Sequence, residues 1–231
     1  QQGYAMQYEL TQSDRKLLES ARQKLLQRRQ QYRQIPVDDK LLAGWNGLAL
    51  SAFSLAYKEL SDAELKNTAG AIARYIRKSL VEDGNLIRAI REGRPIGQAS
   101  LADYAYVAEG FWHYYLLTGS KVDMNIAQSI IDAGWEKFYS SSGWNLGAMA
   151  GIESAGRQAI IADGPQASPS SVLLDISYQL AKKTGDKQLG EKVQNALGFD
   201  ALGLSRDPFW YASQVGVIAD VFLDSTEKSI D

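Results

Sequence analysis

Four times along this chain, a helical segment with one apolar face is followed by a segment that is apolar on nearly all sides. The first kind is typical of a surface helix and the second of a helix enclosed by protein. The surface kind covers residues 11–31, 61–80, 120–139 and 186–197, and the enclosed kind covers residues 44–60, 100–117, 168–182 and 207–223. This alternation predicts about four helical hairpins side by side, each with an inner and an outer helix, which is an all-α fold of the α/α toroid type.

Local signals support these helix starts. Capping-box patterns stand at Thr11/Asp14, Ser61/Glu64 and Ser100/Asp103, and cap-plus-proline pairs stand at Ser168-Pro169 and Asp207-Pro208. Residues 85–97 suit two short strands around Glu92-Gly93, and residues 157–161 suit a further strand, so short β insertions are expected. The long Gly/Ser-rich connection over 140–168 is of a kind that often carries function.

Composition excludes several classes of function. The chain has 231 residues, which is enough for a single domain over 1–231, and it begins at Gln1, which suggests a piece of a longer protein. It has no cysteine and one histidine, His113, so disulfides, thiolate chemistry and histidine-based metal sites are not expected. No basic stripe indicates nucleic acid, no apolar run reaches membrane-spanning length, and no signal peptide is visible, which favours the cytoplasm.

A toroid of this kind would bring polar residues together. Its inner helices run parallel, so their N-termini gather at one end, and residues far apart in sequence meet on one rim. Carboxylates and flat aromatic rings near these N-termini suit the chemistry and the stacking of sugars. The catalytic candidates are Asp39, Asp103 and Asp163, and the substrate-binding candidates are Asp38, Lys40, Trp45, Asn46, Tyr104, Trp144 and Ser168.

Each carboxylate also has a plainer interpretation. Asp103 completes a capping box, and carboxylates favour helix N-termini through the helix dipole. Asp163 stands about five residues before its helix, too far to cap it directly, which favours a functional role. Asp38 and Asp39 are adjacent, so at most one would face a cavity. His113 lies on an aromatic helix, which favours a core histidine over a catalytic one.

The stretch from Arg29 to Leu48 resembles the signature of a known family. The chain is similar to the R…P…DDK…WNGL signature of the YyaL-like, spermatogenesis-associated family of thioredoxin-domain proteins through Arg29, Pro36, Asp38-Asp39-Lys40 and Trp45-Asn46-Gly47-Leu48. Two weaker matches follow in order, Leu101-Ala-Asp103-Tyr104-Ala105 for LEDYA and Asp163-Gly164 to Ser171 for DGAxPSxNS. Here Ala102 replaces a glutamate, Ala167 takes the place of the proline, and Pro169 and Ser170 replace the residues that follow it.

The resemblance implies an (α/α)₆ toroid of the six-hairpin glycosidase-like kind, which needs twelve helices where this chain shows eight. It also implies an upstream thioredoxin-like domain. No cofactor is expected for this region. Related epimerases rely on histidines, so epimerase chemistry is not expected with His113 alone.

Two functional hypotheses follow. The first is a carbohydrate-binding or glycoside-hydrolase-like domain that takes a sugar or sugar derivative at the rim. The second is a non-catalytic helical module that supports a thioredoxin-like domain or docks another protein. An incomplete ring would expose apolar surface, which predicts self-association or docking. The sequence leaves open the ligand, the oligomeric state and the segment that completes the toroid.

Overall fold

The computed structural model describes residues 11–32, 37–82, 85–141, 143–145, 162–197 and 201–227. The chain divides into two compact units, Gln1–Asp39 and Lys40–Asp231. The first unit contains helix α1 (Gln12–Tyr32). Its predicted capping box is present, because the Thr11 amide and hydroxyl both donate to the Asp14 carboxylate and the Asp14 amide donates back to Thr11 Oγ1.

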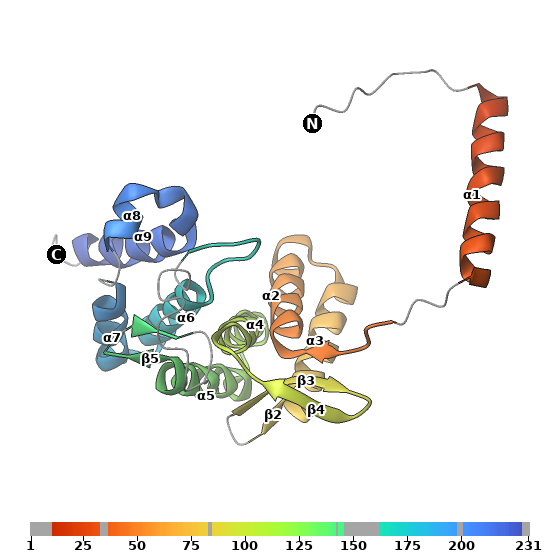
Figure 1. Cartoon of the computed structure of the whole chain (residues 1–231). Helices are drawn as coiled ribbons and strands as arrows, with labels where there is room; N and C mark the ends of the chain where they lie inside the picture. The colour runs from red at the N-terminus through yellow and green to blue at the C-terminus, as the bar shows by residue number, and fades with distance from the viewer. Residues whose placement is uncertain are drawn as a thin grey trace. The chain divides into compact units, whose positions relative to one another are not determined.

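The second unit is built from paired helices, labelled in Figure 1. Its helices are α2 (Ala43–Leu60), α3 (Ala63–Ser79), α4 (Leu101–Thr118), α5 (Lys121–Phe138), α6 (Pro169–Thr184), α7 (Lys187–Leu197), α8 (Ala201–Arg206), the 3₁₀ turn η2 (Pro208–Tyr211) and α9 (Ala212–Glu227). The helices predicted from the alternating pattern are present at these positions. Helix α8 was not predicted, and the strand expected over 157–161 lies outside the described residues.

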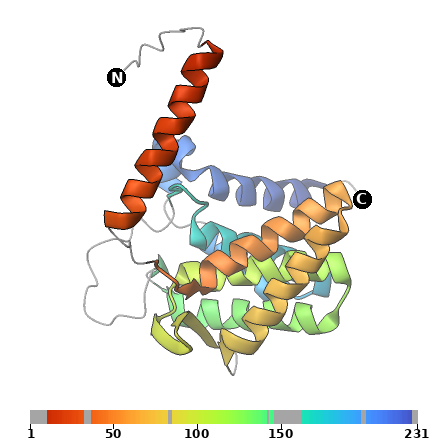
Figure 2. The same cartoon turned by 90° about the vertical axis from the view of Figure 1, so that its right-hand side faces the viewer.

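The inner helices form a row in the order α2, α4, α6, α9, and α3, α5 and α7 pack against it. All four inner helices run in the same direction, so their N-termini lie at one end of this unit, on the left in Figure 2. Helices α4 and α6 are the most enclosed, with ten buried residues each. The common direction of the inner helices confirms the geometric basis on which convergence of their N-termini was expected.

Helix α9 departs from the expectation that every inner helix is enclosed. It stands at one end of the row and packs mainly on α6, so Val215, Phe222 and Leu223 remain exposed. Trp45 and Leu55 are exposed on α2, at the other end of the row. Self-association through such surfaces stays a prediction. No helix in the described part of the chain has the length and apolar character needed to cross a bilayer.

A small antiparallel sheet flanks the helices. Strand β3 (Asn85–Arg91) pairs with β1 (Leu41–Leu42), β2 (Val81–Glu82) and β4 (Arg94–Gln98). The β3–β4 hairpin was predicted, and its turn residues Glu92 and Gly93 have φ of 50° and 74°, as a two-residue hairpin turn requires. A second pair joins β5 (Tyr139–Ser140) to β6 (Gly143–Trp144). Strand β1 places the start of α2 beside the sheet.

Candidate active site

Asp103 joins the N-termini of α2 and α4. Its Oδ2 accepts hydrogen bonds of 2.8 Å from both the amide and the hydroxyl of Ser100, which closes the predicted capping box. Its Oδ1 accepts a bond of 3.1 Å from the amide of Gly44, in the first turn of α2. The side chain is buried, and both of its oxygens are engaged. Asp103 is therefore placed to hold two parallel helices at the same level.

Asp163 does the same for α6 and α9. Its Oδ1 accepts a bond of 2.8 Å from the amide of Ser168, the N-cap residue of α6, and its Oδ2 accepts one of 2.8 Å from the amide of Ser213, in the first turn of α9. The Asp163 amide donates to the Trp210 carbonyl at 2.7 Å. The two carboxylates thus form a repeated device, each using a helix N-terminus on either side.

Tyr106 links the two halves of this row. Its hydroxyl donates to the carbonyl oxygen of Ala167 at 2.7 Å, which connects α4 to the segment that precedes α6. The four inner N-termini are therefore joined in sequence by Asp103, Tyr106 and Asp163. Predicted convergence of Asp103 and Asp163 at one end is found, but the two carboxylates serve different helix pairs.

Asp163→Asn is expected to lower the free energy of unfolding by about 2 kcal/mol. The amide nitrogen would face a backbone N–H, so one of the two bonds would be replaced by two opposed donors. Urea unfolding of both proteins measures the difference. Asp62→Asn is the matched control, because Asp62 caps α3 at an exposed position where asparagine caps equally well. Equal stability of Asp163→Asn and the wild type would contradict the role given to Asp163.

The other predicted residues are dispersed. Tyr104 is buried in the core, accepting a hydrogen bond from the Leu86 amide. Trp144 is buried against Trp135 and Tyr139. Neither residue lines the pocket described below.

Two predicted residues lie at helix starts, and the rest are exposed. Asn46 donates to the Leu42 carbonyl at the start of α2, and Ser168 is the buried N-cap of α6. Trp45 and Lys40 are exposed. Asp38 and Asp39 are exposed residues of the first unit, and their sugar-binding and catalytic roles stay predictions.

Three carboxylates that were not among the residues predicted from the sequence face one pocket below the rim. Glu109 on α4, Asp175 on α6 and Asp220 on α9 line a pocket of about 250 Å³. Each stands six to eight residues after the start of its helix, which at 1.5 Å per residue is about 9–12 Å along the axis. Because the helices are parallel and aligned at their N-termini, the three side chains reach a common level.

Burial and mutual repulsion set the protonation of this group. Burial, followed by the charge of Asp175, raises the pKa of Glu109 to about 7. Burial also raises the pKa of Asp175, with a further contribution from Asp220, against a lowering by the hydrogen bond from Gln179. A carboxyl group that titrates near neutral pH can donate and accept protons under physiological conditions, which an ordinary carboxylate does poorly.

Asp175 is held in place by two hydrogen-bonded side chains in series, Gln179 and Trp112. Its two oxygens are each 3.0 Å from Nε2 of Gln179, which donates to them. Oε1 of Gln179 in turn accepts a bond of 2.6 Å from Nε1 of Trp112, on α4. The indole N–H can only donate, so it fixes the orientation of the Gln179 amide and leaves the Nε2 donor pointing at Asp175.

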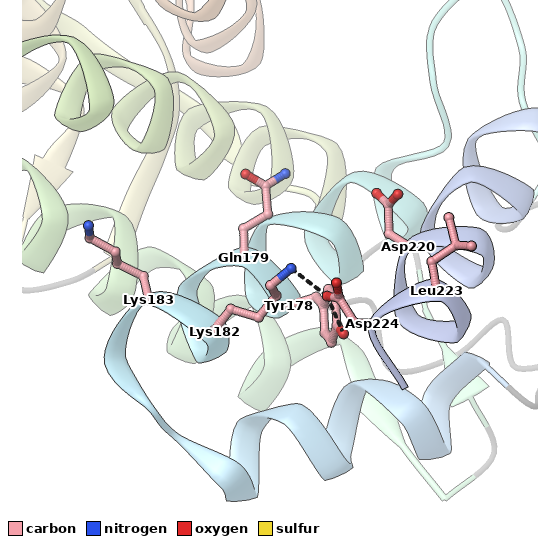
Figure 3. A pocket seen from close by; sticks show the side chains of 7 residues that line it. All are labelled: Tyr178, Gln179, Lys182, Lys183, Asp220, Leu223 and Asp224. Atoms are coloured by element: carbon pink, nitrogen blue, oxygen red, sulfur yellow. Dashed lines mark hydrogen bonds and ion pairs between the residues drawn. The ribbon is translucent and has the colours of Figure 1, made fainter. Parts of the chain in front are cut away.

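A larger pocket of about 640 Å³ adjoins the first and is shown in Figure 3. It lies toward the C-terminal halves of α6 and α9, and Asp220 lines both pockets. Lys182 forms an ion pair with Asp224, which also accepts a hydrogen bond of 2.8 Å from the Tyr178 hydroxyl. Burial and then Asp224 raise the pKa of Tyr178 to about 12. A long ligand could extend from the carboxylate pocket into this one.

The sequence did contain a signal for the carboxylate pocket. Beyond the first turn, Glu109 and Asp220 are the only charged residues of the inner segments 100–117 and 207–223, and Asp175 is the only charged residue of α6 before Lys182. Isolated charges in enclosed helices are rare unless they are paired or functional. Within the described residues, no three or more His, Cys, Asp or Glu side chains are grouped as metal ligands. His113 instead pairs with Ser51 on α2, at 2.8 Å between Nδ1 and Oγ.

The chain is similar to one curated family by sequence. No protein-family model matches it. Over 191 residues it is 27% identical to spermatogenesis-associated protein 20 of Homo sapiens, a match that covers 77% of this chain and 24% of that protein. It is similar to the same protein of Rattus norvegicus at 27% identity and of Mus musculus at 26% identity. The resemblance predicted from its motifs is thereby confirmed, and the chain spans about a quarter of the length of these relatives.

Solved structures with a similar fold come from carbohydrate enzymes. A sugar epimerase from a ruminal bacterium matches with a TM-score of 0.58 and 17% identity, over 71% of this chain and 44% of that chain. An unsaturated glucuronyl hydrolase from Bacillus sp. GL1 matches with a TM-score of 0.50 and 16% identity, over 82% of this chain and 56% of that chain. At these identities the likeness concerns the fold alone, and it confirms the predicted α/α toroid.

Proposed function

We propose that this chain is a carbohydrate-processing domain that hydrolyses a glycosidic bond by acid/base catalysis. Glu109 is the general acid and Asp220 the general base. The proposal rests chiefly on one observation: a half-buried carboxyl group whose pKa is raised to about 7 shares a pocket with two further carboxylates. The names of the structural neighbours, a sugar epimerase and a glucuronyl hydrolase, are in keeping with a sugar substrate.

The environments of the three carboxylates suit different roles. Glu109 is largely buried, which keeps a proton on it that it can give to the leaving oxygen. Asp220 is exposed at the edge of the pocket, where it can take a proton from the water that attacks the anomeric carbon. The attack forms the new C–O bond as the glycosidic C–O bond breaks. Asp175, held by Gln179, keeps the pKa of Glu109 high.

The choice of substrate tests the role of Glu109. An aryl glycoside such as a 4-methylumbelliferyl glycoside has a leaving group that departs without protonation, whereas a disaccharide needs the acid. We expect Glu109→Gln to lower turnover of a panel of disaccharides by about 10²–10⁴-fold and to affect the matching aryl glycosides far less. We expect Asp220→Asn to lower both, because the attacking water loses its base.

The assay measures released 4-methylumbelliferone and reducing sugar. Glu136→Gln, an exposed carboxylate on α5, is the matched control and is expected to behave as the wild type. Turnover of neither substrate class by the folded wild type would refute the proposed hydrolysis. If Glu109→Gln lowers the turnover of disaccharides and of aryl glycosides equally, Glu109 is not the general acid.

One observation favours the second function, a docking module. The exposed side chains of Val215, Phe222 and Leu223 lie on α9 at the end of the row of inner helices. Large apolar patches of this kind mark interaction surfaces. An inactive but folded wild type whose sedimentation shows dimers, and whose Phe222→Ser variant is monomeric, would favour this function over hydrolysis.

A further inference from the structure

The carboxylate pocket has an unbalanced charge. Glu109, Asp175 and Asp220 line it, and none of its described lining residues is a lysine, arginine or histidine. Lys182 and Lys183 line the adjoining pocket, and Lys182 is engaged by Asp224. Asp220 raises the pKa of Asp175, and Asp175 that of Glu109, so the three groups repel one another's charge. A ligand that brings positive charge would relieve this repulsion.

A second feature points to a polar ligand. Ser171 lies on α6 and lines the same pocket, it is 1% exposed, and its Oγ has no hydrogen-bond partner among the described residues. A buried hydroxyl without a partner is uncommon, because the lost hydrogen bond with water is not replaced. Ser213, on α9, lines the pocket as well. Hydroxyl groups of a bound ligand would supply the partner that Ser171 lacks.

We propose that the sugar taken by this pocket is an amino sugar, with its ammonium group against Asp220 and Asp175 and a ring hydroxyl on Ser171. The inference deepens the proposed function and rests on it, since it names the class of carbohydrate at the same site. A sugar acid would bring a further negative charge to Asp175 and Asp220, beside the protonated Glu109, and a neutral sugar would leave the repulsion between the two aspartates unrelieved. An ammonium attracts both carboxylates, and this attraction is strong because the site is partly shielded from water.

Four monosaccharides built on the same type of ring differ in the charge that they carry, and comparison of their binding tests the effect of that charge. They are glucosamine, N-acetylglucosamine, glucose and glucuronate, and their dissociation constants are measured by ligand-observed NMR at about pH 6, where a sugar amine is protonated. We expect glucosamine to bind about tenfold more tightly than glucose and N-acetylglucosamine, and glucuronate to bind most weakly. N-acetylglucosamine is the decisive comparison, because it keeps the nitrogen and loses the charge.

Variants place the binding in this pocket. Asp220→Asn is expected to reduce the preference for glucosamine over glucose to within about twofold, and Ser171→Ala to weaken both sugars by a similar factor, about fivefold. Asp132→Asn, which removes an exposed carboxylate on the outer helix α5, is the matched control and should keep the tenfold preference.

The outcomes separate the two proposals. Binding of glucose or glucuronate as tight as that of glucosamine would overturn the amino-sugar inference and leave hydrolysis at this site standing. A tenfold preference for glucosamine that survives Asp220→Asn would also overturn it, because the amine would then bind elsewhere. Failure of all four sugars to bind, together with an inactive wild type in the glycoside assay, would remove the proposed function itself.

Discussion

Glu109→Gln is expected to raise the free energy of unfolding by up to about 3 kcal/mol above pH 8, and to change it little at about pH 4.5. Burial, and then the charge of Asp175, raise the pKa of Glu109 to about 7 in the folded protein, from 4.5 as an ordinary glutamate. The folded state therefore binds the proton more tightly than the unfolded chain does. Stability is greatest where Glu109 is protonated, and it falls as the pH rises from about 4.5 through about 7. Glutamine mimics the protonated form at every pH, so the variant escapes this loss.

The measurement is a set of urea unfolding curves between about pH 4.5 and 9 for the wild type, Glu109→Gln and Glu136→Gln. The difference between Glu109→Gln and the wild type should grow with pH, whereas Glu136→Gln should follow the wild type because its carboxylate is exposed on α5. Parallel curves for Glu109→Gln and the wild type would show that Glu109 titrates as an ordinary carboxylate. The proposed acid catalysis would then lose its physical basis.

A variant that is more stable and less active is the signature of a functional group. A buried carboxylate that destabilises the fold at neutral pH is retained where it performs chemistry, since a neutral residue of the same size would fit better. Replacement of Asp103 or Asp163 is expected to lower stability instead. The oxygens of both carboxylates accept hydrogen bonds from backbone and hydroxyl groups at the starts of the inner helices. Their removal weakens the scaffold. This contrast separates the two groups of carboxylates by experiment.

The sequence was sufficient to predict the helices other than α8, and their order. Helix starts are set by interactions within a few residues, so they can be predicted without knowledge of tertiary contacts. Examples are the capping patterns at Thr11 and Ser100 and the proline after Ser168. Strand β1 could not be predicted, because it has only two residues, Leu41 and Leu42, and they form a strand only by pairing with β3. Helix α9 was expected to be enclosed, and its exposure depends on its place at the end of the row.

The residues that line the carboxylate pocket were not selected from the sequence, for a geometric reason. The inner helix α4 has ten buried residues around its circumference, so its sequence does not show which side chains face a cavity and which face the core. Tyr104 and Asp103 are neighbours, yet the first bonds to the sheet at Leu86 and the second to α2 at Gly44. Glu109 could have been selected because it is the only carboxylate of α4 beyond the first turn, where no capping role explains it. Asp175 and Asp220 could be identified as its partners only once the fold was known.

Gly47→Ala is expected to lower the free energy of unfolding by about 3 kcal/mol or more. A Cβ at Gly47 would stand 2.4 Å from the carbonyl oxygen of Tyr106 and 2.6 Å from the amide nitrogen of Val107. These are backbone atoms of α4, which cannot rotate away, so α2 and α4 would have to separate. Gly110→Ala meets the same obstacle from the other side, since its Cβ would lie 2.6 Å from the Gly47 carbonyl oxygen.

The matched control is Gly190→Ala on the outer helix α7, where the nearest atom to a new Cβ is the Ala181 Cβ at 4.0 Å. There alanine is expected to stabilise the protein by up to about 1 kcal/mol, through its better helix propensity. Equilibrium unfolding of each variant gives the comparison, and a small effect of Gly47→Ala would show that α2 and α4 can shift apart freely.

The double variant tests the contact itself. If Gly47→Ala already parts the two helices, then adding Gly110→Ala should cost less than it does alone, because touching residues are not additive. Separation of α2 from α4 would also strain the Asp103 bond to Gly44 and displace Tyr106, whose hydroxyl holds the segment at Ala167 beside the pocket. Because Ala167 lines the carboxylate pocket, a loss of pocket function should accompany any displacement of Tyr106.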